Sequence, residues 1–415
     1  MAREIAVPEL PIWRDSASLI ICVKTTDELR ACNYKLLMLK RSDRTSLIDD
    51  QTVFPGGLYD DSDEAIEWLK YFEKFGVTEQ MFDKLGGRCY DELYNSTNAM
   101  PSEISLRINA LRETFEEVGV FLCRNRKQLL KPKQWSFCKP AYDYEQSYWQ
   151  QIVHNDPRQF LRMCRELKVV PDLWSLYKWS CWASPAALRK GYETTFFVSF
   201  LQETPMLLPE KSEVKECLWS SPMQYLQMHR DKKIHLSSPQ FYEITRFTRK
   251  GSFDKLQKFA QERDKCEVAF YLPILYLCDD GIVSVLPGSF SIGDDFYIGD
   301  ARSSLELRQI NCTIEQFQLK SKRIHRIETI GSPSTAVRLN FKPLRDHLLP
   351  ICEAYMAPEI FTETNSGSHG RAVDIWSVGC VMVEMASGKD GRKEDLSTLE
   401  SNEPERRSFR RYNVT

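Results

Sequence analysis

The feature that most constrains this chain is a group of three carboxylates in one short segment. The segment reads Arg112-Glu113-Thr114-Phe115-Glu116-Glu117-Val118-Gly119-Val120. Glu113, Glu116 and Glu117 stand at positions i, i+3 and i+4, so a helix would place them on one face, where they repel one another. A cation is therefore expected at that face.

The same helix should be apolar on its opposite face. Four apolar residues follow helical spacing and should pack against a sheet: Leu106, Leu111, Phe115 and Val118. We expect Ser102 to be the N-cap of this helix. We expect Gly119 to end it, because glycine readily adopts the left-handed conformation that often follows a last helical turn.

A glycine pair lies upstream of the helix, in the run Val53-Phe54-Pro55-Gly56-Gly57. Pro55 fixes one backbone dihedral angle, and the two glycines let the chain turn sharply or approach a phosphate. Together, the turn and the acidic helix resemble the Nudix hydrolases, whose box joins a glycine to Arg-Glu-x-x-Glu-Glu-x-Gly. In that family the box glutamates bind magnesium or manganese on a pyrophosphate.

The spacing within this box is unusual. Counted back from Gly119, the first glycine would fall at Asn98 and the early glutamate at Ile104, and neither residue matches. The glycine pair instead lies more than fifty residues before Arg112, so an insertion is expected at about residues 58–102. This split box resembles one branch of the family, the animal peroxisomal coenzyme A diphosphatases.

The resemblance implies an α/β chain with the Nudix fold, a mixed β-sheet sandwiched between helices, with helical insertions. Strands are predicted at residues 16–23, 34–41 and 194–200, which are rich in β-branched, aromatic and other apolar residues. The insertion should contain a helix around residues 64–72, packed on the domain and without a catalytic role. We expect the Nudix domain to cover residues 10–350.

The resemblance also implies the metal site. Glu113, Glu116 and Glu117 are the predicted ligands of Mg²⁺ or Mn²⁺, which suit clustered carboxylate oxygens. Arg112 should orient a glutamate through a charge-assisted contact. Three candidates for the general base stay open: Glu113, Glu117 and Glu213. The residues predicted to act in catalysis are Arg112, Glu113, Glu117 and Glu213.

A second acidic pair, Glu213 and Glu216, precedes Trp219. The resembling branch has a glutamate in a similar place, so either residue is a candidate for a further metal ligand or for the base. The alternative is that both are solvated carboxylates at the start of a strand. The residues predicted to bind substrate are Arg41, Phe54, Gly56 and Gly57.

The composition restricts the class of partner. The 415 residues are 42% hydrophobic and 27% charged, with a formal net charge of -2. We expect no nucleic-acid partner, because no basic excess is present, and no membrane partner, because no apolar run reaches the length of a membrane span. The oligomeric state stays open. Thirteen scattered cysteines without a C-x-x-C pair favour a reducing compartment over disulfides or zinc.

A different resemblance lies near the C-terminus, in two runs of residues. Tyr355-Met356-Ala357-Pro358-Glu359 and Asp374-Ile375-Trp376-Ser377-Val378-Gly379-Cys380 resemble the end of the activation segment and the next helix of protein kinases. We predict an incomplete helical fragment of a kinase C-lobe at residues 351–389. Residues 390–415 are charged and lack aliphatic periodicity, so a disordered tail is expected.

Two alternative functions follow from this fragment: a protein kinase-related protein that binds ATP and phosphorylates Ser or Thr, and a non-catalytic scaffold. A kinase needs a glycine-rich loop, a strand lysine, a catalytic aspartate and a metal-binding Asp-Phe-Gly, and we find none in usable form. His229-Arg230-Asp231 spells the catalytic-loop tripeptide, but Leu236 stands where the loop requires asparagine.

The Nudix branch implies a small-molecule substrate, a nucleoside diphosphate derivative of the coenzyme A class. Coenzyme A or acyl-CoA would be cut into adenosine 3′,5′-bisphosphate and a phosphopantetheine product. The branch also implies a peroxisomal location. The sequence ends in Tyr412-Asn413-Val414-Thr415 and not in a tripeptide of the Ser-Lys-Leu type, so a cytoplasmic location is the alternative.

Overall fold

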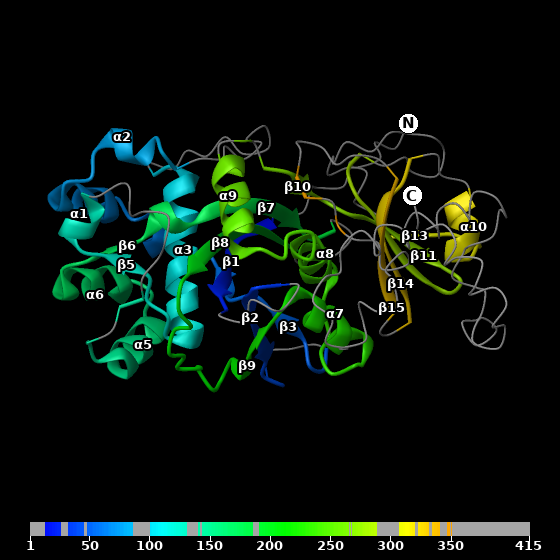
Figure 1. The fold of residues 1–415 in the computed structure, drawn as a ribbon, viewed down its shortest axis with the longest axis horizontal. Coiled ribbons are helices and arrows are strands. Elements are labelled where there is room, and N and C mark those ends of the chain that lie inside the picture. Colours follow the sequence, from blue (N-terminus) through cyan, green and yellow to red (C-terminus); the bar gives the residue numbers. More distant parts are fainter. Residues whose placement is uncertain are drawn as a thin grey trace, which may run out of the picture. The chain divides into compact units, whose positions relative to one another are not determined.

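A computed structural model describes the following residues: 13–25, 32–44, 48–85, 100–130, 140–141, 143–185, 191–264, 266, 268–288, 307–319, 323–331, 334–340, 347–348 and 350. They belong to one compact unit, whose helices and strands are drawn in Figure 1. The expected kinase-like fragment at 351–389 and the expected tail at 390–415 lie outside the described residues.

An eight-stranded mixed sheet lies at the centre of this unit. Its strands are β1 (Trp13–Lys24), β2 (Tyr34–Arg41), β3 (Thr52–Val53), β4 (Gly56–Leu58), β7 (Tyr177–Ala183), β8 (Gly191–Leu201), β9 (Val214–Ser220) and β10 (Phe270–Tyr271). The order is β10-β7-β8-β1-β2-β3, with β4 on β1 and β9 on β2. Because β1 is parallel to β8 and antiparallel to β2, the predicted mixed sheet and its three predicted strands are confirmed.

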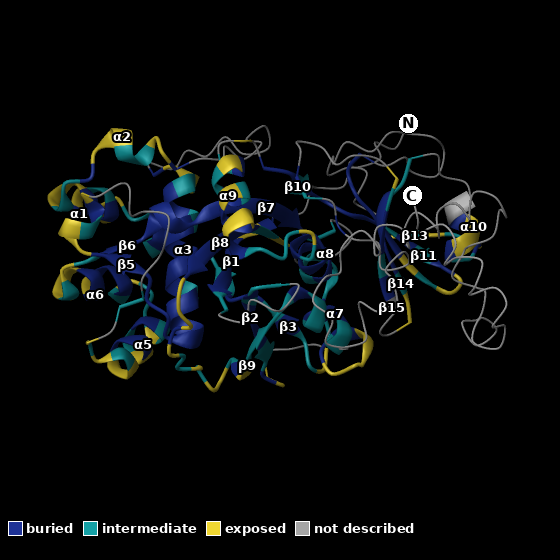
Figure 2. Cartoon of the chain, viewed as in Figure 1, coloured by how far each residue is buried: buried dark blue, intermediate teal, exposed yellow. Residues whose placement is uncertain are grey.

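Helices cover both faces of this sheet. Leu19 and Ile21 of β1 belong to one apolar cluster with Phe115 of α3 (Ser102–Val118). On the opposite face, Phe200 of β8 packs edge-on against Phe253 of α9 (Phe253–Arg263), with ring centroids 5.4 Å apart. Figure 2 shows that the central strands and much of α3 are buried. The sandwich of a sheet between helices is therefore confirmed.

The helix α3 differs from the prediction only at its start. Ser102 is its first residue, and Pro101 occupies the N-cap position without a side-chain cap. The prediction of Ser102 as N-cap was thus wrong by one residue, because the extended backbone of Pro101 already leads into the helix. At the other end, Gly119 caps the helix with φ 71°, as predicted. Phe115 and Val118 are fully buried.

The insertion folds as short helical pieces against the core. They are the 3-10 turn η1 (Asp61–Glu64), α1 (Glu67–Phe75) and α2 (Glu79–Phe82). The expected helix at 64–72 is therefore present, split between η1 and α1. Its Phe72 packs edge-on against Trp174, with ring centroids 6.1 Å apart. Ala65 breaks the helix after η1, where its ψ of 127° leaves the helical region.

The remaining helices and short strands before β10 lie between strands of the central sheet in the sequence. They are β5 (Cys123–Arg124), α4 (Arg126–Leu129), α5 (Gln146–Asn155), α6 (Gln159–Leu167), β6 (Val170–Pro171), η3 (Leu173–Ser175), α7 (Pro222–Arg230) and α8 (Ser238–Phe247). The tripeptide His229-Arg230-Asp231 ends α7, where His229 is buried. No helix among the described residues is both long and apolar enough to cross a membrane.

A second sheet, which the sequence did not predict, follows the helices. Its order is β13-β11-β12-β14-β15. These strands and one helix are β11 (Ile274–Cys278), β12 (Gly281–Val285), β13 (Arg308–Gln309), α10 (Ile314–Leu319), β14 (His325–Ile330) and β15 (Ser334–Leu339). A buried polar network joins this sheet to α8, because Tyr242 Oη lies 2.8 Å from His325 Nε2.

The same network reaches the central sheet through Glu243. Its fully buried carboxylate accepts hydrogen bonds of 2.8 Å from Trp179 Nε1 and Trp182 Nε1, and it pairs with Arg246 at 3.2 Å. A buried carboxylate costs free energy unless hydrogen bonds satisfy its lone pairs. The network therefore fixes α8 between β7 and β14.

His325 makes the stability of the fold depend on pH. Burial lowers its pKa to about 4, while its Nδ1 lies 2.8 Å from the carbonyl of Pro287. Because the unfolded histidine titrates near 6.5, the unfolded chain binds the proton first, and stability falls as the pH drops from about 6.5 toward 4. Between pH 7 and pH 5, we expect the free energy of unfolding of His325→Gln to fall by about 2 kcal/mol less than that of the wild type, as measured by urea unfolding. Equal losses would contradict this.

Candidate functional site

One guanidinium stands at the centre of the acidic cluster. Arg112 of α3 is almost fully buried and pairs with Asp63 of η1 through two contacts. Its Nε lies 2.8 Å from Oδ1 of Asp63, and its Nη2 lies 2.8 Å from Oδ2. Nη2 also donates to the carbonyl of Leu58 at 3.1 Å. This two-pronged contact fixes the plane of the guanidinium.

The remaining nitrogen of Arg112 faces the box glutamates. Nη1 lies 2.9 Å from Oε1 of Glu113 and 2.6 Å from Oε1 of Glu116. The predicted contact between Arg112 and a glutamate is therefore present, and it reaches two of them. Three carboxyl groups therefore share one guanidinium.

The glycine turn meets the helix at this cluster, as its place in the sequence predicted. The backbone N–H of Gly56 donates to Oε2 of Glu117 at 2.8 Å. A Cβ on Gly57 would lie 2.2 Å from Oε2 of Glu113, and a Cβ on Gly56 would lie 2.3 Å from the carbonyl of Ala17. Gly56 is sterically required because its clash is with backbone, whereas a side chain at Gly57 would push aside the carboxylate end of Glu113.

Burial raises the pKa of all three box glutamates. The pKa of Glu113 rises to about 8, since burial and the neighbouring Glu116 outweigh the opposing effect of Arg112. Burial likewise raises the pKa of Glu116 to about 7. The pKa of Glu117 is raised strongly by burial and by Glu113, although the Gly56 N–H favours the anion. A bound cation would relieve this shared repulsion.

The structure separates the two acidic residues near β9. Glu213 lies at the start of β9, close enough that its charge raises the pKa of both Glu116 and Glu117. Glu216 is exposed and pairs in register with Lys40 of β2. Of the two candidates, Glu213 is the one that lies at the cluster.

Two residues predicted to bind substrate have different environments. Arg41 lies within electrostatic reach of Glu117, where its charge lowers the pKa of that carboxyl. Its Nε is buried and has no hydrogen-bond partner in the described part of the chain. Phe54 is buried and packs edge-on against Phe196, with centroids 6.3 Å apart. Phe54 thus packs in the interior, and a substrate contact for it stays a prediction.

Asp63 is the residue that our sequence reasoning missed. It lies six residues after Gly57, the same interval that separates Asn98 from Ile104 in the uninterrupted count. The insertion therefore interrupts the box after its early acidic position and not before it. The first turn of the insertion, η1, supplies the partner of Arg112, while the absence of a catalytic role for the insertion stays a prediction. The interval from Gly57 was the signal that could have found it.

A second element that our sequence reasoning missed is α5. Its glutamine side chains donate hydrogen bonds to the end of α3. Gln146 Nε2 donates to the carbonyl of Gly119 at 2.7 Å, and Gln150 Nε2 donates to the carbonyl of Glu116 at 2.9 Å. One turn further, His154 Nδ1 lies 3.9 Å from Oε2 of Glu116. Gln150 also donates to the carbonyl of Leu208 at 2.7 Å, which attaches the loop before β9.

The cluster fits a divalent cation by its chemistry. The carboxyl groups of Asp63, Glu113 and Glu116 contact Arg112, Glu117 contacts the glycine turn, and oxygen donors of this kind suit Mg²⁺ or Mn²⁺. Within the described residues, no three donor side chains are yet arranged to hold an ion. The reason is visible in the contacts: Glu113 and Glu116 turn toward Arg112, and Glu117 turns toward Gly56.

The pairing of Asp63 with Arg112 should be visible in stability. Breaking a buried ion pair leaves an uncompensated charge, so we expect Asp63→Asn to lower the free energy of unfolding by on the order of 3 kcal/mol. Asp61→Asn is the matched control, because Asp61 is exposed in the same turn. Urea unfolding of the full chain measures both. A midpoint for Asp63→Asn equal to that of Asp61→Asn would show that the pair is not a stabilising one.

A short stretch of the chain resembles a protein kinase, and the structure resembles a solved Nudix hydrolase. A stretch of 36 residues is 61% identical to mitogen-activated protein kinase kinase kinase 4 of Homo sapiens and covers 9% of this chain and 2% of that protein. The chain thus carries a short kinase-like fragment. A crystal structure of a NUDIX hydrolase from Alicyclobacillus acidocaldarius has a TM-score of 0.46 at 16% identity, covering 60% of this chain and 97% of that one.

The main comparison concerns the domain that holds the carboxylate cluster. The family model described as the NUDT19 Nudix domain matches residues 13–247. Acyl-coenzyme A diphosphatase NUDT19 of Homo sapiens is 30% identical over 359 residues, which cover 81% of this chain and 94% of that protein. The matched range contains Gly56, Asp63, the box helix and Glu213. The chain therefore belongs to the Nudix hydrolases, in the family of the NUDT19 Nudix domain.

Proposed function

We propose that this Nudix hydrolase cleaves the diphosphate bond of coenzyme A or an acyl-CoA, with a divalent metal ion as cofactor. The products would be adenosine 3′,5′-bisphosphate and phosphopantetheine or its acyl ester. The substrate class rests on the relative that carries the name acyl-coenzyme A diphosphatase and matches 81% of this chain. The observation that carries the reaction type is the contact of the carboxylate cluster with the glycine turn.

Glu113, Glu116 and Glu117 are the proposed ligands of Mg²⁺ or Mn²⁺. The metal ion supplies Lewis acidity, which lowers the pKa of water and stabilises negative charge on phosphate oxygens. For the ligands to engage an ion, Glu113 and Glu116 must turn away from Nη1 of Arg112. The two contacts with Asp63 would keep Arg112 in place and charge-paired while they do so.

Glu213 is the general base that we favour among the three candidates. Glu113 and Glu117 are both proposed ligands, while Glu213 comes from a different element and lies beside Glu116 and Glu117. In this proposal it would accept the proton of an attacking water. The backbone of Gly56 and Gly57 would border the diphosphate, and Arg41 would bind one of its oxygens. The peroxisome is the location we propose, on the branch resemblance alone.

The central test replaces one proposed ligand. We expect Glu116→Gln to abolish magnesium- or manganese-dependent hydrolysis of coenzyme A while the far-ultraviolet circular dichroism spectrum stays unchanged. Glu262→Gln, an exposed glutamate on α9, is the control and should keep full activity. Turnover of coenzyme A is followed as release of adenosine 3′,5′-bisphosphate. A panel of other nucleoside diphosphate derivatives is assayed for comparison. Undiminished turnover by Glu116→Gln would refute the ligand assignment.

A second test separates the two acidic residues of β9. We expect Glu213→Gln to lower kcat by about 10²- to 10⁴-fold, the usual contribution of a general base, with little change in KM. Glu216→Gln should stay within about twofold of the wild type, because that side chain is exposed away from the cluster. Steady-state kinetics at saturating metal measure both. A large effect of Glu216→Gln with none from Glu213→Gln would exclude Glu213 as the base.

A further inference from the structure

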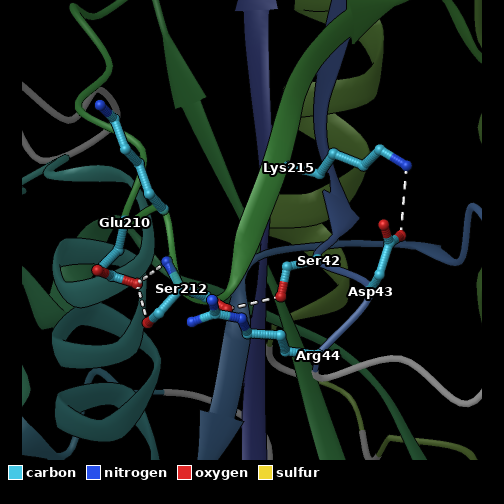
Figure 3. Close-up of a pocket in the computed structure, with 7 residues that line it drawn as sticks. Ser42, Asp43, Arg44, Glu210, Ser212 and Lys215 are labelled. Atoms are coloured by element: carbon cyan, nitrogen blue, oxygen red, sulfur yellow. Dashed lines mark hydrogen bonds and ion pairs between the residues drawn. The ribbon is translucent and has the colours of Figure 1, made fainter.

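A polar pocket of about 630 Å³ lies beside the carboxylate cluster. It is drawn in Figure 3. Its lining includes three cationic side chains, Arg44, Lys211 and Lys215, and two hydroxyl side chains, Ser42 and Ser212. They come from two segments far apart in the sequence, the end of β2 and the loop that leads into β9. No residue of this pocket was among the predicted site residues.

Backbone hydrogen bonds place the pocket directly next to the proposed active site. The N–H of Ser42 donates to the carbonyl of Glu213 at 2.8 Å, so the two lining segments are joined at the proposed base. The N–H of Glu210, another lining residue, donates to the carbonyl of Glu117 at 2.8 Å. Glu210 also lies within electrostatic reach of His154 on α5. The pocket therefore shares its wall with the carboxylate cluster.

Two carboxylates, Glu210 and Asp43, also line the pocket, and each is engaged by other groups of the protein. Glu210 accepts hydrogen bonds from the N–H of Ser212 at 2.7 Å and of Glu213 at 3.2 Å. Asp43 pairs with Lys215 at 3.3 Å, and both side chains are well exposed, at 79% and 47%. An exposed ion pair of this kind contributes little and exchanges readily for a stronger partner.

Two of the cations have no such partner. Neither Arg44 nor Lys211 forms an ion pair with any residue in the described part of the chain. Lys215 occupies a β-bulge, since the register between β2 and β9 shifts from Lys40↔Glu216 to Arg41↔Val214. A bulge redirects a side chain out of the regular pleat. The result is a rim of three cations, while the two hydroxyls of the pocket donate within the protein, Ser42 Oγ to the carbonyl of Ser212 and Ser212 Oγ to the Glu210 carboxylate.

We propose that this pocket binds a phosphate monoester of the substrate, separate from the diphosphate that is cleaved. This inference rests on the proposed function, and in coenzyme A the group is the 3′-phosphate of the ribose. A phosphate monoester carries close to two negative charges at pH 7 and three acceptor oxygens, which match the cations Arg44, Lys211 and Lys215. The pocket thus selects nucleotides that are phosphorylated on the ribose.

The position of the pocket agrees with the covalent structure of that substrate. The 3′-phosphate and the 5′-diphosphate are attached to one ribose ring, so their binding sites must adjoin. Glu213 and Ser212 are consecutive residues, one beside the cluster and one lining the pocket. A ligand without the third phosphate would leave Arg44 and Lys211 solvated and would lose their contribution to binding.

The test compares coenzyme A with dephospho-coenzyme A, which differ only in the 3′-phosphate. We expect the wild-type ratio of kcat/KM to favour coenzyme A by at least about tenfold, as charge-assisted contacts of this kind predict. In the double variant Arg44→Ala with Lys211→Ala, that ratio should fall about tenfold toward one, with kcat/KM for dephospho-coenzyme A unchanged. Lys258→Ala, an exposed lysine on α9, is the control and should keep the wild-type ratio.

A binding measurement keeps this test independent of turnover. Calorimetry on the full chain should show tighter binding of adenosine 3′,5′-bisphosphate than of adenosine 5′-monophosphate, and the double variant should lose that difference. Equal affinities in the wild type, or a ratio unaffected by the double variant, would overturn the pocket assignment. No hydrolysis of either coenzyme by the wild type would overturn the proposed function, while the calorimetric comparison would still decide the pocket.

Discussion

The structure depends on the sharing of one arginine among several buried carboxylates. Arg112 binds Asp63 with two of its nitrogens and offers the third to Glu113 and Glu116. The Asp63 pair ties the insertion to α3. The acidic groups outnumber the cations, and burial raises the pKa of Glu113, Glu116 and Glu117, so one arginine satisfies the site only in part.

The rest of the Nudix domain holds this charged cluster in a fixed frame. The central strand β1 gives the turn of Gly56 a backbone to lie against, and α5 attaches both the end of α3 and the loop before β9. A second buried ion pair, Glu243 with Arg246, performs a comparable task between the central sheet and the second sheet. The Glu243 carboxylate of that pair accepts hydrogen bonds from two indoles and one hydroxyl, so we interpret the pair as structural.

The cluster and the neighbouring pocket have opposite electrostatic character. The cluster consists of the carboxyl groups of α3 near Glu213. The neighbouring pocket contains the cations Arg44, Lys211 and Lys215. In the proposed function, a substrate with several phosphates would meet both: a metal ion would act at the acidic side, while lysine and arginine would contact phosphate directly at the basic side.

The sequence by itself determined the acidic helix, its capping glycine, the strands of the central sheet and the family of the chain, because each depends on local spacing. It named Glu213 as a base candidate but left both Glu213 and Glu216 as candidates for a further metal ligand, and it assigned nothing to Asp63, α5 or the cationic pocket. Tertiary structure decided these, since the β2–β9 register and the path of the insertion bring together residues that no local pattern relates. Which charged residues meet depends on long-range pairing of segments, and the spacing of residues along the chain does not reveal that pairing.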